Sequence, residues 1–131
     1  MTAEEMKKRT RGFALRVLKL VESLPNTQTA DVLGKQLLRC GTSAGANYRA
    51  ACRAKSKPDF IAKLSIVEEE ADEAIYWIEL LIEANLIKPN LVENLLDEAN
   101  QILSIVVSAI KTTKELIKQN PKSEVRSPKS Q

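Results

Sequence analysis

The chain has 131 residues, of which 44% are hydrophobic, 28% charged and only 4% aromatic. This length suits one domain with a substantial core, and four glycines and five prolines are too few for a turn-rich β-sandwich. The chain has no histidine, which excludes the commonest general base, the commonest metal ligand and every Ser-His or Cys-His catalytic pair. We therefore predict a helical protein that is not an enzyme and needs no cofactor.

The first half of the chain predicts two helices. Thr2 and Glu5 form a capping-box pattern, and the first helix spans about 3–24 and stops before Pro25. After a polar turn the second helix covers about 30–55.

The second half predicts two more helices and a tail. Ser56 with Pro58 is a helix-start signature because proline is tolerated in a first turn, and this third helix spans about 57–86. A fourth covers about 89–119, and the polar residues 120–131 form a tail that we expect to be disordered.

Apolar residues recur with helical periodicity in these segments. On the first helix they are Met6, Thr10, Phe13, Val17, Leu20, Val21 and Leu24, and on the third they are Phe60, Leu64, Val67, Ala71, Ala74, Ile78 and Ile82. Because short loops favour antiparallel neighbours, the pattern predicts an all-α fold, an antiparallel up-and-down four-helix bundle over residues 1–119.

Cysteine usage and hydropathy indicate the compartment. If Cys40 and Cys52 lie on one helix, about 18 Å separates them, which is too far for a disulfide. Free thiols suit a reducing compartment, and residues 1–11 lack the apolar core of a signal peptide. The longest mostly apolar run, 102–110, is too short to span a bilayer. We expect a cytoplasmic protein with no membrane partner.

Two features exceed what a plain bundle needs. Gly41 and Gly45 lie inside the second helix, where each costs about 1 kcal/mol against alanine, which indicates either tight packing on another helix or a kink or ligand-facing notch. The third helix carries a second apolar strip beside its core line. These residues are either ordinary exposed apolar side chains or an oligomer interface. The candidate interface comprises Ile66, Tyr76, Trp77 and Leu80.

The charges are segregated along the chain. Residues 34–63 carry seven basic residues and one acid, whereas residues 64–86 carry seven acids and no base. Four basic residues of the second helix fall within an arc of about 80°, and two from the first helix extend the candidate surface. The candidates for binding a phosphate backbone are Lys35, Arg39, Arg49, Arg53, Arg9 and Arg16. Alternatively, this face is solvated or meets the acids of the third helix.

The acids of the third helix raise the question of a metal site. Glu69 and Glu73 are one turn apart, but di-metal bundles pair inward-facing glutamates with histidines, and this chain has no histidine. We therefore predict no metal. Antiparallel packing would place Arg39 level with Glu73. The residues expected to make helix-to-helix contacts are Gly41, Gly45, Asn47, Glu69 and Glu73.

Three segments resemble a known bacterial family of four-helix bundles. They are LGKQLLRCGTSAGANYR at 33–49, SKPDFIAKL at 56–64 and EEEADEAIYWI at 68–78. The family includes proteins encoded within intervening sequences of 23S ribosomal RNA genes, and the chain resembles more distantly the accessory protein of diversity-generating retroelements. The matching positions are Arg39, Asn47, Arg49, Asp59, Phe60, Lys63, Glu69, Glu73, Tyr76 and Trp77. At Cys40 the family often has serine instead.

The resemblance implies a ring-like homopentamer, and for the retroelement relatives a basic surface that binds nucleic acid and a reverse transcriptase partner. Two functions follow as expectations. One is a non-enzymatic oligomer that binds RNA or DNA without strong sequence preference. The other is a structural oligomer that scaffolds another protein, such as a reverse transcriptase.

Overall fold

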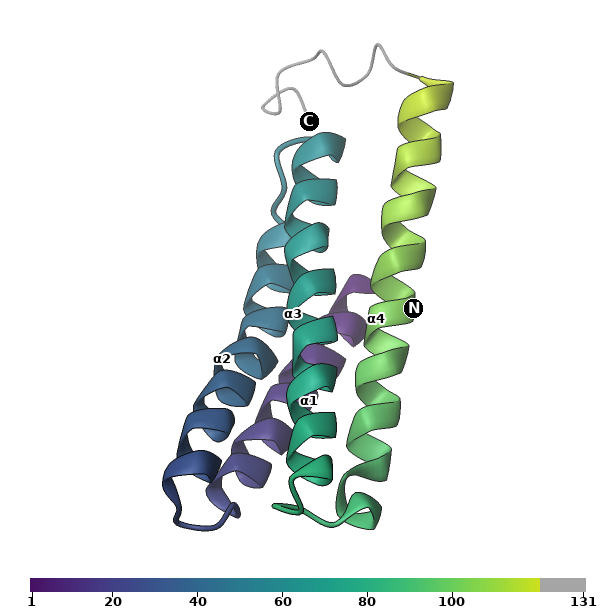
Figure 1. The fold of residues 1–131 in the computed structure, drawn as a ribbon. Helices are drawn as coiled ribbons and strands as arrows, with labels where there is room; N and C mark the ends of the chain where they lie inside the picture. Colours follow the sequence, from purple (N-terminus) through teal and green to yellow (C-terminus); the bar gives the residue numbers. More distant parts are fainter. Residues whose placement is uncertain (121–131) are drawn as a thin grey trace.

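A computed structural model describes residues 1–120, which contain four helices and no strand. The helices are α1 (Ala3–Glu22), α2 (Gln28–Ala51), α3 (Lys57–Glu83) and α4 (Pro89–Gln119). Each runs antiparallel to the helix before it (Figure 1). The expected all-α bundle is confirmed. Almost all of the tail that we expect to be disordered lies outside the described residues.

The predicted start signals are confirmed at α1 and α3. Thr2 accepts a hydrogen bond from the Glu5 backbone N–H at 3.1 Å, and the Glu5 carboxylate accepts one from the Thr2 N–H at 2.8 Å. Ser56 caps α3 by accepting from the Asp59 N–H at 3.1 Å. At α4, Pro89 occupies the first turn.

Two helices, α2 and α3, end three to four residues earlier than predicted, and α1 ends two residues earlier. After Ala51 the chain turns, with the Arg53 N–H donating to the Ala50 carbonyl at 3.0 Å, so that α2 stops four residues short of Lys55. At the end of α3, Asn85 adopts a left-handed φ of 60° and Leu86 donates to the carbonyl of Leu81 at 2.9 Å. This Schellman arrangement ends α3 at Glu83.

The core lies where the periodicity predicts it. Every predicted core position of α1 and α3 is either buried or packed against the buried cluster. The largest fully buried side chains come from all four helices: Phe13, Met6, Leu37, Leu64, Ile78, Leu81, Ile102, Val17, Val67, Val92 and Val106.

The glycines of α2 let α1 approach closely. A Cβ placed on Gly41 would lie 2.8 Å from Cγ1 of Val17, and one on Gly45 would lie 3.3 Å from the Thr10 hydroxyl oxygen. Because α2 continues without a break from Gln28 to Ala51, tight helix packing explains these glycines.

The helices differ in how far they overlap. Figure 1 shows that α1 begins at about mid-height of α4, so the C-terminal half of α4 extends beyond the start of α1. Accordingly α1 contacts α2 more than it contacts α4. In residues 1–120, no helix is long and apolar enough to cross a membrane.

Candidate nucleic-acid interface

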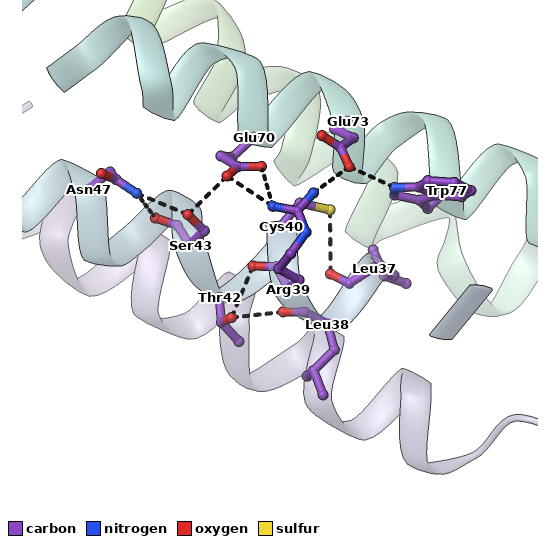
Figure 2. Close-up of polar contacts among 10 residues, drawn as sticks. All are labelled: Leu37, Leu38, Arg39, Cys40, Thr42, Ser43, Asn47, Glu70, Glu73 and Trp77. Carbon is purple, nitrogen blue, oxygen red and sulfur yellow. Dashed lines mark hydrogen bonds and ion pairs between the residues drawn. The ribbon is translucent and has the colours of Figure 1, made fainter. Parts of the chain in front are cut away.

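Arg39 is engaged within the subunit rather than free on the surface. Figure 2 shows its guanidinium between two carboxylates of α3. It donates to Glu70 at 3.1 and 3.2 Å and to Glu73 at 2.5 Å. These bonds raise the pKa of Arg39, so it stays charged. The register that places Arg39 level with Glu73 is therefore confirmed, and Glu70 is its second partner.

The same network extends along both helices. Glu70 also accepts from the Ser43 hydroxyl at 3.1 Å, and the Asn47 amide donates to Ser43 at 2.9 Å (Figure 2). The indole of Trp77 donates to Glu73 at 3.1 Å. That bond, together with Arg39, holds the pKa of Glu73 below its ordinary value. The result is one polar chain that links α2 to α3.

Cys40 lies beside this network and faces inward. It is fully buried, and burial raises the pKa of its thiol to about 12. Cys52 is also a free thiol, as the spacing predicts. The Cys40 thiol donates to the backbone carbonyl of Leu37 at 3.5 Å.

Arg9 is also committed to an intramolecular contact. It donates to Glu98 of α4 at 2.6 and 2.9 Å and to Gln101 at 3.0 Å. This bidentate ion pair with Glu98 raises the pKa of Arg9 and links α1 to α4. Lys35 pairs with Asp31 on its own helix at 3.2 Å. Arg16 is exposed on α1, outside the grooves described next.

Arg49 and Arg53 are the two candidates that the structure brings together. They line a shallow groove of about 440 Å³ between α1 and α2. The other lining residues are Glu4, Lys7, Thr10, Arg11, Ala14, Thr42, Gly45 and Ala46. Arg11, Arg49 and Arg53 are exposed and make no ion pair within residues 1–120. Lys7 holds Glu4 at 3.2 Å.

A second groove, of about 390 Å³, continues from the first toward the start of α3. It shares Arg49 and Arg53, and Lys63 lines it while holding Asp59 at 2.6 Å. That pair holds the pKa of Asp59 below its ordinary value. We call the cations of the two grooves the basic track: Lys7, Arg11, Arg49, Arg53, Lys55 and Lys63.

The sequence analysis did not select Lys7 and Arg11, although helical phase distinguishes them from Arg9 and Arg16. Relative to the core line of α1, the first two lie on the flank toward α2 and the last two on the flank toward α4. The flank that faces α2 is identified by two contacts: Val17 packs against Gly41, and Thr10 packs against Gly45.

The predicted apolar strip of α3 is partly covered. Tyr76 is 56% exposed and Ile66 40% exposed, whereas Trp77 and Leu80 are half-buried. The rings of Tyr76 and Trp77 meet edge to face with centroids 5.0 Å apart.

Of the predicted helix contacts, Gly41, Gly45 and Glu73 cross between helices, whereas Asn47 bonds within α2. Glu69 points to solvent and makes no ion pair in the described part of the chain. Over the same residues, no three Cys, Asp or Glu side chains gather closely enough to hold a metal ion.

Comparisons with known proteins agree with this architecture. A crystal structure from Bacteroides thetaiotaomicron, described as a protein of unknown function from the S23 ribosomal protein family, matches with a TM-score of 0.79 and 40% identity. The match covers 85% of this chain and 99% of that one. No curated protein matches the chain. The family model described as 23S rRNA-intervening sequence protein matches residues 3–108, and the chain therefore belongs to that family.

Proposed function

We propose that this protein is a non-enzymatic binder of the nucleic-acid phosphate backbone and that the basic track is its contact surface. The observation that carries the proposal is the arrangement of Arg11, Arg49 and Arg53. These three exposed cations, which have no ion-pair partner within residues 1–120, converge on one groove from α1, from the last turn of α2 and from the turn that follows it. Arginine is well suited to phosphate because its planar fork donates two parallel hydrogen bonds.

The floor of the groove supports close approach of a ligand. Ala14, Gly45 and Ala46 are small, so long side chains at the rim surround an open surface. About three phosphate contacts from one protomer give weak, largely sequence-independent binding. A homo-oligomer, with five copies as the expected number, would repeat the track and gain affinity through multivalency.

A structural oligomer that binds another protein is the second candidate, and exposed Tyr76 is the observation that favours it. Tyrosine is enriched in protein interfaces, and Tyr76 and Ile66 are both exposed on α3. In this proposal, Tyr76→Ala lowers the mass measured by light scattering, whereas Thr112→Ala on the exposed side of α4 does not. A wild-type monomer at tens of micromolar would overturn it.

A binding titration with a charge-matched control tests the main proposal. RNA is the first probe because the family is named for 23S rRNA. Fluorescence anisotropy with a 24-nucleotide single-stranded RNA should show affinity that falls roughly eighteenfold between 50 and 200 mM salt, as three contacts to a single strand require. The double variant Arg49→Glu, Arg53→Glu should lose this binding.

The control variant is Lys8→Glu, Lys19→Glu. It changes the net charge by the same four units, but both residues are exposed outside the two grooves. It should keep most of the affinity, and circular dichroism should show equal helicity in both doubles. The proposal is refuted if the wild type does not bind RNA at 50 mM salt. If the two double variants lose equal affinity, the basic track is not the binding surface.

A further inference from the structure

We infer that the basic track takes a double-stranded nucleic acid in preference to an unstacked single strand. This inference rests on the proposed function and narrows its ligand. It follows from what the grooves contain besides cations, namely small apolar residues, two threonines and two acids already held by lysines.

The grooves have no aromatic side chain on which a base would stack. The chain has five aromatic residues in all, and each lies outside the two grooves. Phe13 is buried, and Tyr48 and Phe60 pack against the core. Tyr76 and Trp77 lie about 20 Å along α3 from Lys63. Proteins that bind single strands without sequence preference combine a cationic groove with aromatic stacking, so this track lacks half of that arrangement.

The grooves also offer little to a base edge. Their uncharged polar side chains are Thr10 and Thr42, and both hydroxyls donate to carbonyls of their own helix at 2.7–3.1 Å. No asparagine or glutamine lines either groove. A single strand has unstacked bases that need partners, whereas a duplex pairs its bases internally and presents phosphates. The track therefore fits the duplex better.

The cations also form two short rows. Lys7 and Arg11 are one helical turn, about 6 Å, apart on α1. In the other row, Arg49 lies in the last turn of α2 and Arg53 in the turn that follows Ala51. The axes of packed helices lie about 8–10 Å apart, and the glycines of α2 favour the close end of that range. Both pairs of cations can therefore contact one duplex, which carries two rows of phosphates, at the same time.

The test compares one labelled 24-nucleotide RNA, of a sequence without self-pairing, with the same strand annealed to its complement. Three phosphate contacts give salt slopes of about −2.7 for a duplex and −2.1 for a single strand. If the two affinities are equal at 1 M salt, the duplex is about sixfold tighter at 50 mM salt. Arg49→Gln, Arg53→Gln should reduce the duplex slope by about 1.8.

A gain-of-function variant checks the cause. Ala46 is exposed on the floor of both grooves, so Ala46→Trp would supply the missing stacking surface. It should strengthen single-strand binding by about fivefold or more, whereas duplex binding should not gain, because a bulky side chain on the groove floor hinders close approach of a duplex.

The outcomes separate the two claims. Single-strand binding that equals or exceeds duplex binding overturns the inference and leaves the proposed function standing. Absence of salt-dependent binding to both probes overturns both. Competition by poly-glutamate that equals competition by unlabelled duplex, at equal charge, also overturns the inference, because the track would then recognise charge density without duplex geometry.

Discussion

The basic arc of about 80° on α2 has two edges, one facing α3 and one facing α1, and their arginines have different partners. Arg39 lies on the edge toward α3, where Glu70 and Glu73 neutralise it, whereas Arg49 lies on the edge toward α1, where Lys7 and Arg11 add positive charge. Both are exposed arginines within about 80° of one helix surface. The neighbouring helix therefore decides whether an arginine stabilises the fold or remains available to a ligand.

The close α1–α2 contact that forms the groove predicts the largest effect. Gly41→Ala should lower the free energy of unfolding by about 1–3 kcal/mol, because the new Cβ would lie within 3.0 Å of the stiff Val17 side chain. Gly12→Ala is the matched control, because nothing lies within 4 Å of its Cβ position. It should raise stability by up to about 1 kcal/mol. Urea denaturation measures both, and equal stabilities would contradict the contact.

Placing an acid in the groove would make the α1 edge resemble the α3 edge. Ala46→Glu puts a carboxylate next to Arg49 and Arg53. Nucleic-acid affinity should fall about fivefold or more at 0.15 M salt, since one lost phosphate contact has about that effect. Ala46→Gln matches the glutamate in size without the charge and should bind more tightly than the Glu variant. Equal affinities for the Glu and Gln variants would show that charge at this position is irrelevant.

Single neutral substitutions at the two edges should separate stability from binding. Arg39→Gln should lower the melting temperature, because Glu70, only 16% exposed, loses its cationic partner. Nucleic-acid affinity should change little. Arg53→Gln should leave the melting temperature unchanged and reduce the salt slope by about 0.9. The opposite pattern in thermal melts and anisotropy would reverse the assignment of the two edges.

Acid titration predicts the smallest effect, confined to the α3 edge. The pKa of Glu73 is lowered, chiefly by the Trp77 indole and then by Arg39, so its ionised form stabilises the fold above pH 4.5. That contribution is lost as the pH falls through the lowered pKa. Trp77 is the chain's single tryptophan, so its fluorescence should report a step below pH 4.5. Glu73→Gln should abolish the step and Asp59→Asn should retain it; a step that survives Glu73→Gln arises elsewhere.

Much of the architecture was predictable because it depends on local physics. The capping box at Thr2, the Ser56 cap and the apolar periodicity act over one or two turns, and all three appear in the structure as predicted. The end of α2 was predicted four residues too late because its last turn depends on the docking of Asp59 on the Lys55 backbone, a contact with the next helix.

The sequence by itself determined the four helices, their buried faces and the separation of basic from acidic segments. It also determined the antiparallel register that places Arg39 beside Glu73. Periodicity and short loops are sufficient for these features. Only the tertiary structure decided which cations are paired. Arg9 was a candidate for the binding surface, yet it faces Glu98, 89 positions away in the chain. Lys7 and Arg11 join Arg49 because Gly41 and Gly45 bring that flank of α1 against α2. Charge pairing depends on distances of a few ångströms between helices, and these distances follow from how side chains pack.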